Sequence, residues 1–141
     1  MEAGTSQAIE CEVRIDASPE TIFEFFTDPL KAVQWMGEQA TLDPRPGGIY
    51  QVAMNDQYVA IGEYVEVDPP HHISFTWGWK DDVERMPPGS STVDITLEPD
   101  GDATVVRLVH SGIPAEAVES HRGGWNRFLP QLAIVVNKEE S

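Results

Sequence analysis

Residues 73–80 read ISFTWGWK. Large apolar side chains occupy every second position of this stretch, and small residues fill the gaps: Ile73, Phe75, Trp77 and Trp79 alternate with Ser74, Thr76 and Gly78. Because successive side chains of a strand point to opposite faces, the pattern predicts a strand with one strongly apolar face. Two indoles so close together predict either a densely packed aromatic core or the wall of a cavity.

Further strands flank this stretch on both sides. Apolar residues alternate with polar ones in each of them: Ile9 to Ile15, Tyr50 to Met54, Val59 to Val67, Val93 to Leu97 and Val106 to His110. Turn sequences rich in Asp, Pro and Gly separate them at 68–70 and 99–102. Consecutive strands joined by short turns predict an antiparallel meander.

Helices are predicted in two places. Ser18 is a good N-cap with Pro19 in the first turn after it, and Asp28-Pro29 ends this helix, so a second short helix follows over 30–35. Apolar residues recur at three-, four- and seven-residue intervals from Val118 to Asn137, which predicts a long C-terminal helix with Pro130 inside it. This helix is long enough to cover the apolar face of the sheet, so the sequence predicts an α+β fold.

The composition bounds the kind of protein. A chain of 141 residues fits one domain, 1–141. The single Cys11 cannot form an internal disulfide, and the N-terminus lacks the basic and apolar segments of a secretion signal, which favours a cytoplasmic protein. No apolar run reaches the roughly 20 residues that membrane insertion needs.

The acidic net charge limits the classes of partner that the protein can bind. The formal net charge of −15 disfavours nucleic acid and anionic membrane surfaces, because both need a basic footprint. One interpretation is that the charge keeps the protein soluble. The other is that it favours a basic protein partner or a neutral to cationic ligand.

Five motifs together resemble a known family: IDASPETIFEFFTDP (15–29), DPRPGGIY (43–50), GEYVEVDPPHHISFTW (62–77), SSTVDITLEPDGDATVVRLVHSGIP (90–114) and Gly124-Trp125. They resemble the domain homologous to the activator of the 90-kDa heat-shock-protein ATPase, within the START, SRPBCC and birch-pollen-allergen superfamily. The resemblance implies a helix-grip fold, in which a curved antiparallel sheet wraps around a long C-terminal helix and two short helices follow the first strand.

For function, the resemblance implies more than one activity. Single-domain relatives look like binders of small hydrophobic or amphipathic molecules, which is the function we expect here, with its physiological role open. Interaction with a chaperone is an alternative, and so is a cyclase or hydratase that uses the same cavity.

A cavity between the sheet and the final helix would be lined mainly by large apolar groups. The residues we expect there are Tyr50, Met54, Phe75, Trp77, Trp79, Trp125 and Phe128. The alternative is that these side chains fill the core, as large aromatic residues commonly do.

Two polar residues share the inward parity of their strands. Glu63 falls in line with Val59 and Val67, and His110 falls in line with Val106. Such a pair would orient a ligand or move a proton, whereas the alternative places Glu63 in water and His110 in a hydrogen bond at the sheet.

No other pattern adds chemistry. The histidines and Cys11 lack metal-site spacing, no serine has a nucleophile-elbow setting, and no cofactor motif is present, so we assign no catalytic or metal residue and leave enzymatic activity open. A homodimer formed through exposed strand edges or through the last helix is a further alternative.

Overall fold

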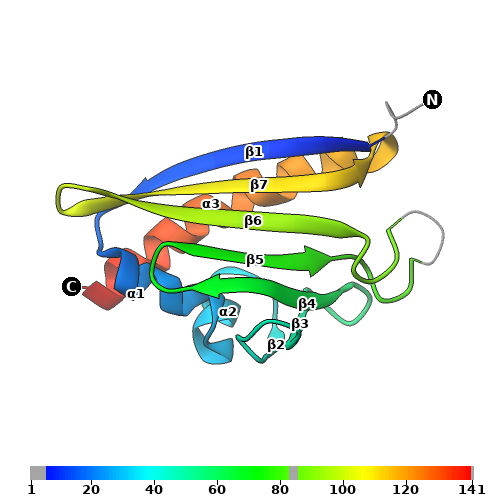
Figure 1. The fold of residues 1–141 in the computed structure, drawn as a ribbon, viewed down its shortest axis with the longest axis horizontal. Coiled ribbons are helices and arrows are strands. Elements are labelled where there is room, and N and C mark those ends of the chain that lie inside the picture. The colour runs from blue at the N-terminus through cyan, green and yellow to red at the C-terminus, as the bar shows by residue number, and fades with distance from the viewer. Residues whose placement is uncertain (1–5, 83–85, 141) are drawn as a thin grey trace.

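The computed structural model describes residues 6–82 and 86–140. Seven antiparallel strands form one sheet in the order β1-β7-β6-β5-β4-β3-β2. The strands are β1 (Ser6–Ile15), β2 (Gln39–Leu42), β3 (Ile49–Ala53), β4 (Val59–Asp68), β5 (His72–Trp77), β6 (Ser91–Asp100) and β7 (Ala103–Pro114). From β2 to β7 each strand pairs with the next one in the chain, so the predicted meander is confirmed (Figure 1). The edges are β1 and β2, and the homodimer stays a prediction.

Short helices connect β1 to β2. They are α1 (Pro19–Phe23), the 3-10 turn η2 (Glu24–Phe26) and α2 (Pro29–Trp35). The Ser18 hydroxyl accepts the backbone N–H of Thr21, and the Asp28 carboxylate accepts that of Leu30. Each cap satisfies an otherwise unpaired helix N–H, which explains why both predicted helices form where they do.

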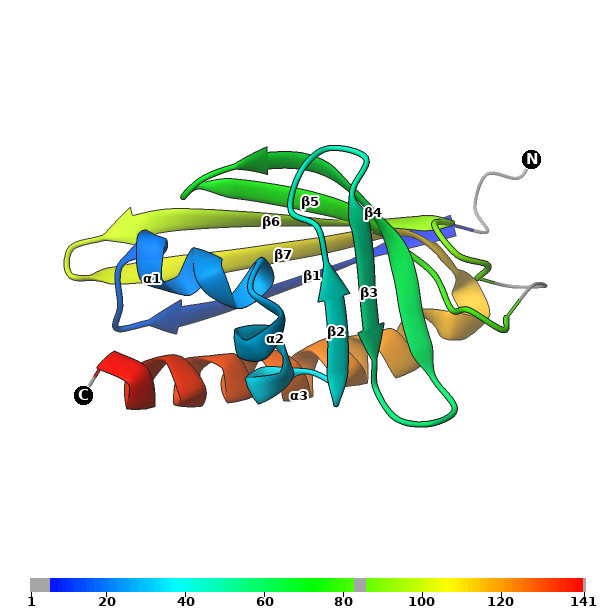
Figure 2. The same ribbon diagram turned by 90° about the horizontal axis from the view of Figure 1, so that it is seen from below.

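The C-terminal helix covers one face of the sheet. After the 3-10 turn η3 (Ala115–Ala117), α3 runs from Val118 to Glu140 and continues through Pro130, slightly beyond its predicted end. Figure 2 shows α3 crossing the curved sheet, with α1 toward its C-terminal end and α2 near its middle. Its buried side chains pack into the core that the sheet lines: Val118, Trp125, Leu129, Leu132 and Val136. The α+β helix-grip architecture is therefore confirmed.

A bulge in β4 changes which residues face this core. Tyr64 pairs with Phe75 and Glu66 pairs with Ser74, so Val65 has no partner on β5. Ala60 and Tyr64 are buried before the bulge, and Val65 is half exposed. The predicted single inward parity from Val59 to Val67 is therefore wrong, because an extra residue in one strand reverses the alternation after it.

Gly78 sets the geometry beyond β5. A Cβ at this position would lie 1.8 Å from the carbonyl oxygen of Pro87, so only glycine lets the two backbones approach this closely. Backbone hydrogen bonds continue past Gly78: the Trp79 N–H donates to the Met86 carbonyl oxygen, and the Lys80 N–H donates to the Val59 carbonyl oxygen. Trp79, which follows this glycine, is partly buried and packs against the core. None of the helices in the described part of the chain is long and apolar enough to span a membrane.

Candidate functional site

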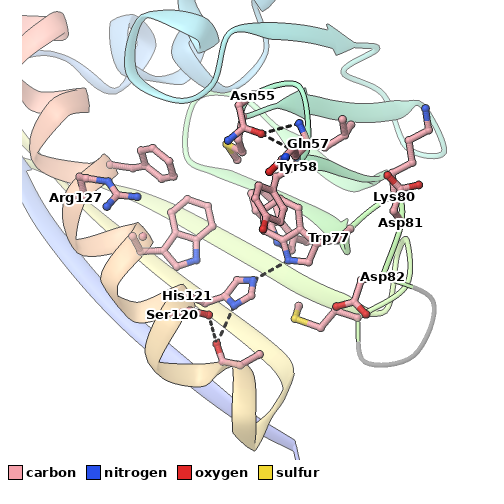
Figure 3. A pocket seen from close by; sticks show the side chains of 18 of the residues that line it. Asn55, Gln57, Tyr58, Trp77, Lys80, Asp81, Asp82, Ser120, His121 and Arg127 are labelled. Carbon is pink, nitrogen blue, oxygen red and sulfur yellow. Dashed lines mark hydrogen bonds between the residues drawn. The ribbon is translucent and has the colours of Figure 1, made fainter.

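A pocket of about 700 Å³ opens between the N-terminal half of α3 and the ends of two strands (Figure 3). The β3–β4 turn contributes Met54 and Tyr58, β5 and the segment after it contribute Trp77 and Trp79, and α3 contributes Trp125 and other residues. Its volume lies within the range of roughly 300–1,000 Å³ that is typical of small-molecule sites.

Three indole rings belong to the pocket lining. Trp77 is the centre of the group: its ring centroid lies 5.5 Å from that of Trp79, at an interplanar angle of 81°, and 5.3 Å from that of Trp125. Trp77 and Trp125 are almost fully buried, whereas Trp79 is partly exposed. The question raised by the two indoles of ISFTWGWK has a divided answer, because Trp77 closes the core and Trp79 borders the open space.

A hydrogen bond fixes Trp79 against α3. Its Nε1–H donates to His121 Nε2 at 3.1 Å, and His121 Nδ1 lies 2.9 Å from the Ala117 carbonyl oxygen. Since Nε2 accepts, the ring proton lies on Nδ1 and is donated to Ala117, so the imidazole is neutral. Burial lowers the pKa of His121, and the hydrogen bond to Ala117 opposes this in part.

His110 has a similar arrangement deeper in the core. Its Nδ1 accepts from Trp125 Nε1 at 3.0 Å, so its proton lies on Nε2, which lies 2.8 Å from Ser91 Oγ. The Ser91 hydroxyl in turn donates to the Trp77 carbonyl oxygen at 2.6 Å. Burial, with a smaller contribution from His121, lowers the pKa of His110 to about 3. Every hydrogen-bonding group of this imidazole is satisfied in the neutral form.

One polar atom of the pocket lining has no such partner. Among the described residues, Trp77 Nε1 is a buried side-chain nitrogen without a hydrogen bond. A buried donor left unpaired costs about 1–3 kcal/mol, and an acceptor atom that reached it would recover part of that cost.

The predicted site residues divide into three groups: those that line the pocket, those in the closed core, and Glu63 on the exposed surface. Five of them line the pocket: Met54, Trp77, Trp79, Trp125 and Phe128. Tyr50 and Phe75 lie in the closed core instead, where their rings stack at 3.8 Å and 12° and both are at most 3% exposed. His110 faces inward as predicted, but it too lies in the core and outside the pocket lining.

Glu63 does not face the interior. Its side chain is exposed on β4, because the inward positions before the bulge are Ala60 and Tyr64. The backbone N–H of Glu63 donates to Thr76 Oγ1, which anchors the strand and leaves the carboxylate in water. The predicted Glu63–His110 pair is therefore wrong.

The sequence patterns did not predict His121 and Tyr58, which both line the pocket. His121 precedes Trp125 by four residues, so both lie on one helix face, and this spacing was the available signal. Tyr58 follows a turn that begins at Asn55. The Asn55 side-chain oxygen accepts hydrogen bonds from the backbone N–H groups of Gln57 and Tyr58. The Tyr58 ring lies 6.2 Å from that of Trp79 at 78°, a contact with no sequence signature.

Charged side chains stand around the opening. Lys80, Asp81, Asp82, Glu116 and Arg127 belong to the lining. Figure 3 shows Arg127 on α3, on the opposite side of the indoles from Asp81 and Asp82. Within the part of the chain that the structure describes, no three His, Cys, Asp or Glu side chains are grouped to hold a metal ion.

Residues 16–137 match the sequence model of the family described as "Activator of Hsp90 ATPase homolog 1-like protein". The chain belongs to this family. Activator of 90 kDa heat shock protein ATPase homolog 1 from Homo sapiens is 30% identical over 112 residues, which are 79% of this chain and 31% of the human protein. The chain thus spans about a third of the length of the curated family members it matches.

Several solved structures share the fold. The AHSA1-like protein of Rhizobium etli is 39% identical with a TM-score of 0.73, over 93% of this chain and 82% of that one. A Mesorhizobium loti protein is 22% identical with a TM-score of 0.84, over 94% and 98%. An HSP90 activator from Plasmodium falciparum is 24% identical with a TM-score of 0.78, over 93% and 96%.

Proposed function

We propose that the protein binds a small hydrophobic or amphipathic molecule in the pocket between α3 and the strand ends. The observation that supports this most directly is the 700 Å³ space bordered by three of the four tryptophans. Burying apolar ligand surface against them stabilises a complex by about 25 cal/mol per Å² before the costs of association. The Trp77 N–H and the charged opening suit a ligand that also has a polar group.

Gly124 offers a way to fill the pocket without disturbing the fold. It lines the pocket, and a Cβ built on it meets no atom within 4 Å. Gly123 precedes it on α3, is exposed, also has open space around its Cβ and does not line the pocket. Gly124→Leu and Gly123→Leu therefore form a matched pair that differs in whether the new side chain enters the pocket.

The test measures binding of N-phenyl-1-naphthylamine, a neutral aromatic probe, by energy transfer from tryptophan. We expect Gly124→Leu to lower the affinity about tenfold or more and Gly123→Leu to leave it unchanged. Both should match or exceed the stability of the parent, by up to about 1 kcal/mol, because Gly is a poor helix former. Equal affinities for the two variants, or no binding by the parent, would contradict the proposal.

A second candidate function is interaction with a chaperone, and the family membership favours it. The curated relatives are named as activators of the 90-kDa heat shock protein ATPase, and one protein with the same fold is an HSP90 activator. The net charge of −15 suits a basic surface on such a partner. Binding to a purified 90-kDa chaperone that weakens steeply with salt, and that Gly124→Leu does not alter, would support this candidate. Cyclase or hydratase chemistry stays a prediction.

A further inference from the structure

The aromatic walls of the pocket stand nearly perpendicular to one another. Trp79 makes angles of 81° with Trp77 and 78° with Tyr58, and both ring centroids lie within 6.2 Å of its own. Rings at such angles present their faces from different directions. The face of an aromatic ring is its electron-rich part, and indole attracts a cation within about 6 Å most strongly.

The histidine on the wall adds no positive charge. His121 accepts the Trp79 hydrogen at Nε2 and donates its own proton to Ala117, which is the neutral form of the ring. The same bond occupies the polar edge of Trp79 and holds the indole in place. A charged group near Trp79 therefore meets ring faces and a neutral imidazole.

Charges around the opening are distributed unevenly. The Arg127 guanidinium lies over the Phe128 ring, 5.5 Å from its centroid, on the α3 side. Asp81 lies beyond the indoles on the other side in Figure 3, and Glu116 also belongs to the lining. Among the described lining residues, Lys80 is the other cation besides Arg127, and its side chain extends away from the indoles in Figure 3. With the whole chain at −15, the Trp79 side of the pocket favours positive charge.

We infer that the ligand is an organic cation, an alkylated or quaternary ammonium group on an apolar body, with its charge held by the accessible rings of Trp79 and Tyr58. This inference rests on the proposed function and names the ligand class. Asp81 and Glu116 attract the cation to the opening, and the apolar body lies toward Trp125 and Phe128.

Three matched probes test it by isothermal titration with the full chain. They share one naphthalene ring: (2-naphthylmethyl)trimethylammonium, its neutral isostere 2-neopentylnaphthalene, and 2-naphthylmethanesulfonate. We expect the ammonium probe to bind about 3- to 30-fold more tightly than the isostere, and the sulfonate to bind more weakly than both. An isostere that binds as tightly as the ammonium probe would overturn the inference and leave the proposed function standing. If none of the three binds, the proposed function fails and the inference with it.

Variants locate the effect. Trp79→Leu should abolish the preference for the ammonium probe over the isostere, whereas Trp79→Phe should keep part of it, because a ring face remains. Asp81→Asn combined with Glu116→Gln should weaken the ammonium probe about two- to tenfold and leave the isostere unchanged. Asp102→Asn combined with Glu20→Gln changes the net charge by the same amount at distant exposed sites. This pair should alter neither the affinity for the ammonium probe nor that for the isostere. Equal effects of the two pairs, or an unchanged preference in Trp79→Leu, would overturn the inference.

Discussion

The indole nitrogen of Trp125 donates a hydrogen bond to Nδ1 of His110, 3.0 Å away, in the closed core. The bond joins α3 to β7, and it continues through Ser91 on β6 to the Trp77 carbonyl at the end of β5. Three buried polar side chains thus form one fully paired chain beneath the pocket. Such a network fixes the positions of Trp125 and Trp77 relative to each other, because each donor in it has a single acceptor at hydrogen-bond distance.

Ser91→Ala should destabilise the fold. The substitution leaves His110 Nε2–H and the Trp77 carbonyl without their shared partner, and each is buried. We expect the free energy of unfolding to fall by about 1–3 kcal/mol, measured by urea denaturation.

Ser90→Ala is the matched control, because Ser90 is exposed and precedes Ser91 directly. Its effect should stay within about 0.5 kcal/mol. Equal losses in the two variants would mean that the hydroxyl of Ser91 contributes nothing specific.

Stability should fall in mild acid because of His110. Its pKa is about 3 in the folded protein and near 6.5 in an unfolded chain. Below pH 6.5 the unfolded chain therefore binds a proton at His110 that the folded protein does not bind. The contribution of neutral His110 to folding stability is complete above pH 6.5 and is lost progressively as the pH falls toward 3. One such group makes the protein about 2 kcal/mol less stable at pH 5 than at pH 7.

The comparison is with His110→Gln, unfolded in urea at pH 7, 6 and 5. The variant should be less stable at pH 7, and its stability should depend less on pH by about 2 kcal/mol over this range. Parallel pH profiles for the two proteins would contradict the assignment of a neutral, buried imidazole.

Gly78→Ala should be costly although the change is one methyl group. The new Cβ would overlap the Pro87 carbonyl oxygen at 1.8 Å, and that oxygen belongs to backbone that cannot turn aside as a side chain does. We expect a loss of about 1–3 kcal/mol, with Trp79 displaced from the pocket. Gly101→Ala tests a turn glycine with open space around its Cβ, where the strain comes from φ of +66° alone. Thermal unfolding and tryptophan fluorescence report both effects, and an unshifted spectrum in Gly78→Ala would refute the displacement.

Asp28→Ala should remove the cap of α2. The carboxylate accepts the Leu30 N–H at 2.9 Å, and alanine offers no replacement acceptor. The expected loss is about 1 kcal/mol by urea denaturation. Asp102→Ala, at an exposed turn without this role, provides the comparison, and an equal loss there would contradict the capping argument.

Local chemistry made much of the fold predictable. Alternation placed Ile9, Tyr50 and Ile95 in the core, because a strand has only two faces and one of them is covered. Ser18 and Asp28 marked helix starts, because few side chains satisfy a free N–H there. The family resemblance is confirmed by the match over residues 16–137.

The sequence by itself determined the α+β order, the long final helix and the set of aromatic residues available for a pocket. Only the tertiary structure decided which of them border open space. Glu63 faces water because Ala60 and Tyr64 take the inward positions before the bulge at Val65, and Trp79 is partly exposed where Trp77 is buried. The Trp79–His121 bond joins residues 42 positions apart. Periodicity reports the face on which a side chain lies, whereas a pocket depends on how distant segments meet, and no local pattern encodes that distance.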